Sequence, residues 1–93
     1  MFKRILMRMR EKVRRREYVM TYHARKEMND EDLTVYDVER CILTREIMER
    51  QKDRVTAEWK YRIRGKTVNG GEIEVVAKLS IIGDLVIITV YIP

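Results

Sequence analysis

The spacing of apolar residues changes near residue 45, and this change constrains the fold more than any other feature of the sequence. Before that point, apolar side chains recur every three or four residues, which places them on one face of a helix. After it, they alternate with polar side chains, as in a strand whose two faces differ. Strands joined by short turns pair antiparallel. The sequence therefore predicts an α+β domain with N-terminal helices packed on a four- to five-stranded antiparallel sheet.

Cap signals and apolar stripes divide the first half into helices. Thr21 and Thr34 are expected N-caps, and Asp37 takes the place of Glu in a capping box with Thr34. The first helix is amphipathic and basic, so its apolar stripe should pack on the domain and leave the arginines outward. The expected helices cover residues 2–16, 21–28 and 34–44, and a short β-prone run, 18–20, separates the first two.

The second half reads as a meander of strands. Asn69–Gly71 and Gly83-Asp84 supply the residues that tight turns need. The last strand is the most apolar, which predicts an interior position in the sheet. No repeat or flexible linker interrupts the chain, so residues 1–93 are expected to form a single domain. The expected strands cover residues 46–52, 59–64, 72–79 and 85–92.

Composition favours a cytoplasmic protein. The longest apolar run is far shorter than the ~20 residues of a membrane span, and basic residues interrupt any apolar segment of a signal peptide near the N-terminus. Cys41 is the one cysteine, which excludes an intramolecular disulfide and fits a reducing compartment. Cysteine and histidine are too few for a zinc site. The sequence predicts no metal and no other cofactor.

The positive charge is concentrated at the N-terminus. Residues 1–17 hold eight Lys and Arg against two Glu, a net charge of +6, whereas the remainder of the chain has a net charge of −1. Such clustering favours a polyanion such as nucleic acid, for which Arg8 and Arg15 are candidate contacts. An ordinary solvated helix face has the same composition. The sequence alone leaves both explanations open.

Candidate catalytic residues are few. The chain has no Gly-rich phosphate loop, no HExxH and no nucleophile elbow. Cys41 falls on an apolar helix stripe and is expected in the core. Histidine titrates near neutrality, so His23 is a candidate general acid or base. The alternative, which sequence alone favours, is that His23 packs beside Tyr22 and hydrogen-bonds the sheet.

A row of cations is the second candidate. Lys60, Arg62 and Arg64 alternate along one strand and should share a face, which Lys78 and Tyr91 could extend. RNA cleavage without a metal needs a base for the 2′-hydroxyl, cations for the phosphate charge and a proton donor for the leaving oxygen. Arginine, lysine and tyrosine or histidine can supply these groups together. Outward cations that serve only solubility and edge protection are the alternative.

Short stretches along nearly the whole chain carry a family resemblance. They are Tyr22–Arg25 with Met28, Asp37–Glu39, Ile42–Thr44, Glu49–Asp53, Glu58–Tyr61, Gly65, Val75–Leu79 and Val86–Tyr91. Together they resemble a bacterial domain-of-unknown-function family of the RelE/ParE-like toxin superfamily, in which BrnT-type toxins are cousins. The resemblance implies a RelE-like fold of N-terminal helices against a four- or five-stranded antiparallel sheet.

The resemblance also implies candidate functions. Many members of that superfamily are toxins of type II toxin–antitoxin pairs that cleave messenger RNA, often on the ribosome, while others poison gyrase or have no established activity. His23 matches a motif residue of the family. Lys60, Arg62, Lys78 and Tyr91 match the superfamily's use of basic and tyrosine side chains on the sheet. Genes of the similar subgroup often neighbour a YgiT-type zinc-finger protein, which implies an antitoxin partner covering the basic face.

Two hypotheses of different classes follow. The first is a metal-independent endoribonuclease, an mRNA interferase, with His23 or Tyr91 in proton transfer and Arg62, Arg64 and Lys78 on phosphate. The second is a non-catalytic module that binds nucleic acid through its N-terminal arginines or pairs with a partner protein. A homo-oligomer is compatible with either hypothesis, and the sequence does not choose between them.

Overall fold

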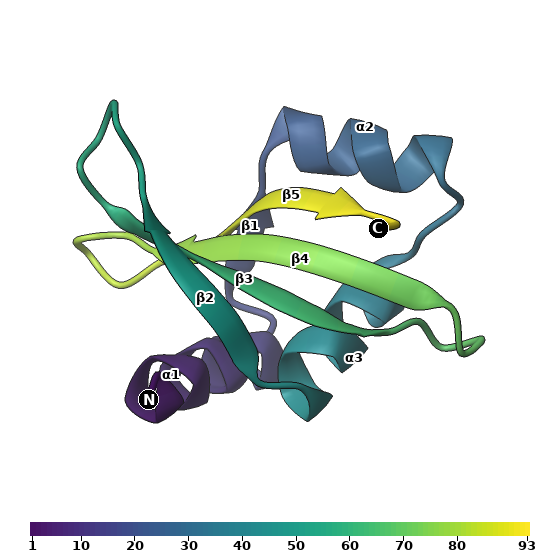
Figure 1. The fold of residues 1–93 in the computed structure, drawn as a ribbon, viewed down its shortest axis with the longest axis horizontal. Helices are drawn as coiled ribbons and strands as arrows, with labels where there is room; N and C mark the ends of the chain where they lie inside the picture. The colour runs from purple at the N-terminus through teal and green to yellow at the C-terminus, as the bar shows by residue number, and fades with distance from the viewer.

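The computed structural model describes all residues from 1 to 93 and has three helices beside a five-stranded sheet (Figure 1). The helices are α1 (Lys3–Arg14), α2 (Tyr22–Asp30) and α3 (Val35–Thr44), and the strands are β1 (Tyr18–Met20), β2 (Ile47–Lys52), β3 (Trp59–Lys66), β4 (Glu72–Leu79) and β5 (Leu85–Tyr91). The predicted α+β class is confirmed. None of the helices has the length and apolar character that crossing a lipid bilayer requires.

The sheet is mixed, with strand order β1-β5-β4-β3-β2. Strands β2 to β5 form the predicted antiparallel meander. The short strand β1 was not predicted as part of the sheet, and it pairs parallel with β5. Parallel pairing is possible here because α2, α3 and strands β2 to β4 lie between β1 and β5 in the chain, which provides the long crossover. Strand β5 is interior, as its apolar sequence predicts.

One hydrophobic core lies between the helices and one face of the sheet. Helix α1 contributes Leu6, Met9 and Val13, at the predicted helical spacing. The helix is slightly shorter than expected, because Phe2 is its N-cap and the backbone turns left-handed at Arg16, with φ of 56°. The other core residues are Ala24, Met28, Val38, Cys41, Ile42, Tyr61, Ile63, Ile73, Val75, Ala77, Leu85, Ile87 and Val90.

One arginine of α1 turns inward, contrary to the prediction that they all point outward. Arg10 donates from Nε to the carbonyl of Ile42 at 2.8 Å and from Nη2 to the carbonyl of Arg45 at 2.9 Å. The last carbonyls of a helix have no partner within the helix, and Arg10 satisfies two at the end of α3. Arg10 therefore joins α1 to α3.

Helix α2 covers an edge of the sheet that β1 leaves unpaired. Strand β1 pairs only with Leu85–Ile87, so the second half of β5 lacks a neighbouring strand on that side. Thr21 Oγ1 donates to the carbonyl of Ile88 at 2.8 Å, and the Glu27 carboxylate accepts from the Val90 N–H at 3.1 Å. These contacts occupy backbone groups that would otherwise be free to pair with another chain.

Helix α3 begins and packs as the sequence predicts. The capping box is present, and the Asp37 carboxylate accepts from the Thr34 N–H at 2.8 Å. The same carboxylate also accepts from the Val68 N–H at 2.8 Å, which ties α3 to the turn between β3 and β4. Cys41 is in the core as predicted, with Sγ 3.5 Å from the carbonyl of Ile63. Burial raises the pKa of this thiol to about 12.

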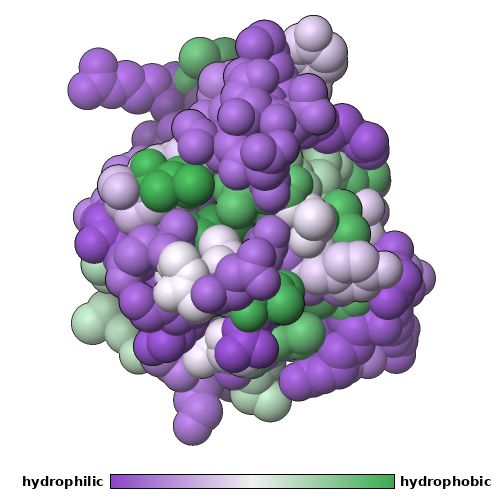
Figure 2. Space-filling model, turned by 90° about the vertical axis from the view of Figure 1, so that its right-hand side faces the viewer, coloured by the Kyte–Doolittle hydropathy of each residue, from purple (hydrophilic) through white to green (hydrophobic).

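The end of the molecule that carries the α2–α3 loop has no large apolar surface. Figure 2 shows this end with hydrophilic side chains over α2 at the top and separate apolar patches below. Small scattered patches are normal for a protein surface and do not define a binding site.

Candidate nucleic-acid interface

The sheet presents one of its faces to solvent. Along β3, Tyr61 and Ile63 enter the core while Lys60, Arg62 and Arg64 lie on the opposite side, which confirms the predicted alternation. We call this side the open face, because Glu74 is the only buried side chain among those that line it. By strand register it includes Glu49, Gln51, Lys60, Arg62, Arg64, Glu74, Val76, Lys78 and Tyr91.

Strand register gathers five of these residues around one point. Arg64 lies opposite Glu74 on β4, and Glu74 lies opposite Tyr91 on β5. Arg62, two residues before Arg64, lies opposite Glu49 on β2. Side chains that face each other on neighbouring strands are close enough to interact. Four strands thus bring arginine, glutamate and tyrosine side chains together.

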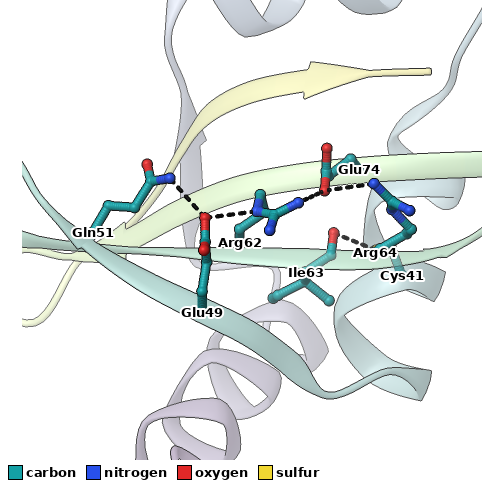
Figure 3. Close-up of polar contacts among 7 residues, drawn as sticks. All are labelled: Cys41, Glu49, Gln51, Arg62, Ile63, Arg64 and Glu74. Carbon is teal, nitrogen blue, oxygen red and sulfur yellow. Dashed lines mark hydrogen bonds and ion pairs between the residues drawn. The ribbon is translucent and has the colours of Figure 1, made fainter. Parts of the chain in front are cut away.

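Glu74 is at the centre of this group, with a side chain only 2% exposed. Arg62 Nη1 donates to Glu74 Oε1, and Arg64 Nη2 lies 3.5 Å from the same oxygen (Figure 3). Burial alone would raise the pKa of Glu74, but contacts with Tyr91 and Arg62 outweigh it and lower the pKa. Glu74 is therefore held as a carboxylate beneath the two arginines.

Arg62 is held between two carboxylates. Its Nε donates to Glu49 Oε1 at 3.0 Å, and its Nη1 donates to Glu74. Gln51 donates to the same Glu49 oxygen at 2.7 Å, which extends the network to the edge strand (Figure 3). The hydrogen bonds that Arg62 donates, first to Glu49 and then to Glu74, raise the pKa of Arg62. Its charge is compensated, so Arg64, whose side chain is 42% exposed, is the more accessible of the two arginines.

Tyr91 completes the group at the β5 side. Its hydrogen bond with the Glu74 carboxylate, together with burial, raises the pKa of the Tyr91 phenol. A raised pKa keeps the phenol protonated at neutral pH, and a protonated phenol can donate a hydrogen bond or a proton. The structure places Tyr91 on the same surface as the cation row, as the sequence predicted.

Lys78 shares the open face but forms a separate pair. Its Nζ lies 3.1 Å from Glu58 Oε1, and both side chains are largely buried. Glu58 precedes β3, so the pair lies toward the end of the sheet at which β3 begins. Its charge is compensated there, and it does not join the cluster around Glu74.

His23 lies elsewhere, at the edge of β5. Its side chain is 67% exposed, and its Nε2 is 3.4 Å from Glu27 Oε1. The favoured expectation that it packs beside Tyr22 is wrong, because Tyr22 is itself 80% exposed. Helix α2 buries Ala24 and Met28, and His23 is off that face. Glu27, and not His23, makes the hydrogen bond to the sheet.

Arg8 in α1 and Arg15, which follows the last residue of that helix, have different surroundings. Arg15 pairs with Glu11 at 2.9 Å and with Glu17 at 3.9 Å, on an exposed surface. Arg8 forms no ion pair and lines a hollow together with Trp59. The predicted nucleic-acid contacts therefore occupy separate places. Lys60 and Arg64 lie on the open face, whereas Arg8 lies on α1 and Arg15 just beyond its end.

Sequence reasoning missed the carboxylates Glu49, Glu58 and Glu74, which are the ion-pair partners of Arg62, Arg64 and Lys78. A signal for Glu74 is present in the sequence. A tight turn centred near Asn69 pairs Arg64 with Glu74, as observed, and opposite charges on facing positions attract. No group of three or more His, Cys, Asp or Glu side chains is arranged to hold a metal ion.

These features define a small α+β protein whose sheet has helices on one face and a charged network on the other. The chain belongs to the family described as a domain of unknown function (DUF4258), which it matches over residues 20–92. The matched part contains every strand of the open face, whereas α1 lies outside it. No curated protein and no solved structure matches the chain.

Proposed function

We propose that this protein is the toxin of a type II toxin–antitoxin pair and cleaves messenger RNA with protein side chains alone. The observation that supports the proposal is the gathering of Arg62, Arg64 and Tyr91 around Glu74 on the open face. Together these groups can bind a phosphate and transfer a proton. The resemblance to RelE/ParE-like toxins supports the same reaction class.

The arginines would bind the scissile phosphate. Arg64 is accessible, and Lys60 adds a second cation on the same strand and face. Arg62 is held in place by Glu49, so its guanidinium is oriented before substrate arrives. Fixed cations stabilise the charge that develops on phosphate in the transition state, since little reorganisation is then needed.

Glu74 and Tyr91 would carry the proton. The 2′-oxygen attacks the adjacent phosphorus, its proton passes to Glu74, and the bond from phosphorus to the 5′-oxygen breaks. Tyr91 gives its proton to the leaving 5′-oxygen and recovers one from Glu74 through their contact. When the phosphate engages Arg64, its guanidinium turns from Glu74 while Glu49 keeps Arg62 in place. Glu74 then has one cation fewer beside it and is a stronger base. His23 has no part in this step, because it lies on α2 beside Glu27.

Expression in cells together with an assay of the purified protein tests this proposal. Wild-type protein should arrest growth and degrade messenger RNA, and Tyr91→Phe should lower the cleavage rate about 100-fold because it removes the proton donor. Arg64→Ala should weaken cleavage, whereas Arg14→Ala, an exposed arginine of α1 outside the open face, should leave it unchanged. A wild-type protein that harms neither cells nor RNA would refute the proposal.

A second candidate is a binding module without catalysis. The observation that favours it is the pairing of Arg62 and Lys78 with glutamates, which compensates much of the charge on the open face. It predicts an RNA affinity that falls steeply with salt and no cleavage. Deleting residues 1–16 is a poor test, since Leu6, Met9 and Val13 belong to the core. Single substitutions of exposed arginines serve better.

The remaining proposals concern compartment and partner. We propose that the protein acts in the cytoplasm and that a cognate antitoxin, of a zinc-finger type, covers the open face. Co-expression with the candidate antitoxin should restore growth and lower the reactivity of Lys60 toward an acetylating reagent. Unchanged reactivity of Lys60 in a purified complex would place the partner on another surface.

A further inference from the structure

Arginine and aromatic side chains alternate on a surface where α1 meets the start of β3. Two adjoining hollows, of about 280 and about 400 Å³, share Ile5 and Tyr61 in their walls. The larger hollow lies beside the β2–β3 and β4–β5 loops, which project at the left end of the sheet in Figure 1. We call this surface the aromatic–arginine strip; it consists of Phe2, Arg4, Arg8, Arg50, Trp59 and Tyr61.

The rings of the strip are held in a fixed arrangement. The guanidinium carbon of Arg50 lies 4.1 Å from the centroid of Trp59 and 5.8 Å from that of Phe2. Phe2 meets Tyr61 edge to face, with ring centroids 5.7 Å apart. Cation–π and edge-to-face contacts orient aromatic rings. Trp59 nevertheless remains 41% exposed, so part of the indole is free to contact a ligand.

The arginines of the strip carry uncompensated charge. Arg4, Arg8 and Arg50 form no ion pair, in contrast to Arg62 on the open face. The only acidic residue in either hollow is Glu58, whose carboxylate is engaged by Lys78. The strip therefore has a net positive charge next to exposed aromatic surface.

We propose that the aromatic–arginine strip binds single-stranded RNA, with an unstacked base against Trp59 and the adjacent phosphates against Arg4 and Arg8. Proteins that bind single strands combine a positive groove with aromatic rings on which bases stack. Thr56 and Ser80, which also line the larger hollow, offer hydroxyl groups to the edge of a base. A duplex does not fit this chemistry, because its bases are already stacked on one another.

The strip adjoins the open face, so this inference rests on the proposed function and extends it. Trp59 and Lys60 are consecutive on β3, and their side chains lie on opposite faces of the sheet. A strand of RNA bound at Trp59 can pass around the start of β3 and reach Lys60 and Arg64. The strip would then hold the substrate while the open face acts on a neighbouring phosphate.

Fluorescence of Trp59 tests the inference, because Trp59 is the one tryptophan of the chain. The full-length protein is titrated with a short single-stranded RNA and with the same sequence as a duplex. The single strand should change the emission saturably, and the duplex should have little effect. Arg8→Ala should weaken binding several-fold and lower the salt slope by about one. Arg14→Ala, on the same helix but outside the strip, should bind like wild type.

Other outcomes separate this inference from the proposed function. If RNA binds equally to both variants and does not change the emission of Trp59, the proposed role of the strip is refuted. Cleavage is assayed in the same samples, so this outcome does not by itself refute the proposed function. A response to an acidic peptide or to phosphatidylserine vesicles, and none to RNA, would also overturn it. Binding at Trp59 without cleavage would support the strip and refute the enzyme. Failure to bind RNA at all would refute both.

Discussion

At the scale of single residues, Glu74 is the least replaceable group of the open face. It is almost fully buried, and its carboxylate receives both Arg62 and Arg64. A buried charge is tolerated only when it is paired and hydrogen-bonded. Removing this carboxylate would leave Arg64 without a counter-charge and Arg62 with Glu49 alone, so the cluster depends on it.

We therefore expect Glu74→Gln to destabilise the protein by about 2 kcal/mol at neutral pH, because charged hydrogen bonds are lost while the shape is kept. The pKa of Glu74 is lowered in the folded protein, so its contribution is present above the unfolded pKa of about 4 and is lost as pH falls further. Urea unfolding of both proteins at neutral and acidic pH measures this. A difference that stays constant on acidification would contradict it.

Cys41 gives a second prediction at this scale. Burial raises the pKa of its thiol to about 12, and the nucleophile in thiol chemistry is the thiolate. Native protein should therefore resist a thiol-labelling reagent at neutral pH, and denaturant should expose the thiol to rapid labelling. Labelling of the folded protein as fast as that of a free thiol would show that α3 does not cover β3 as described.

At the scale of elements, α3 packs closely on β3 at Gly65. A Cβ added there would lie 2.8 Å from Arg45 Cγ, 3.1 Å from Cys41 Sγ and 3.3 Å from Cys41 Cα. The arginine side chain can move aside, but the backbone of α3 cannot do so without shifting the helix. Gly65→Ala should therefore cost about 1–3 kcal/mol, measurable by thermal unfolding. Gly71→Ala, whose nearest contact is 3.4 Å, is the matched control.

Most of the helices and strands could be predicted from the sequence. Local signals were sufficient for the helices, the meander and the capping box at Thr34, because each depends on residues close in the chain. The parallel pairing of β1 with β5 could not be predicted, since three residues carry no register information for a partner far away in sequence. The inward turn of Arg10 depends on how α1 meets α3, which helical periodicity does not specify.

The candidate site, too, could be predicted only in part. Alternation along β3 placed Lys60, Arg62 and Arg64 on one face, as observed. Alternation does not predict which carboxylate pairs with each cation. The ion pairs of Arg62 with Glu49 and Glu74 are therefore known only from the structure. His23 lies outside the open face because it belongs to α2, which packs along the edge of β5.

At the scale of the whole molecule, cations occupy three kinds of surroundings. The arginines around Glu74 form ion pairs that fix their positions, which suits cations that stabilise a reacting phosphate. Those of the aromatic–arginine strip are unpaired and lie beside exposed rings, as a single strand would need. The arginines near the end of α1 pair with Glu11 and Glu17 on an exposed surface, where ion pairs contribute little.

The chemistry of the RNA ends tests the central claim most directly. Attack by the 2′-hydroxyl, assisted by side chains of the open face, predicts fragments with a 2′,3′-cyclic phosphate and a 5′-hydroxyl. A single 2′-deoxy substitution at the cleaved nucleotide should block the cut in an otherwise identical RNA. Fragments with 5′-phosphate ends, or an intact RNA after incubation with the purified protein, would contradict the account.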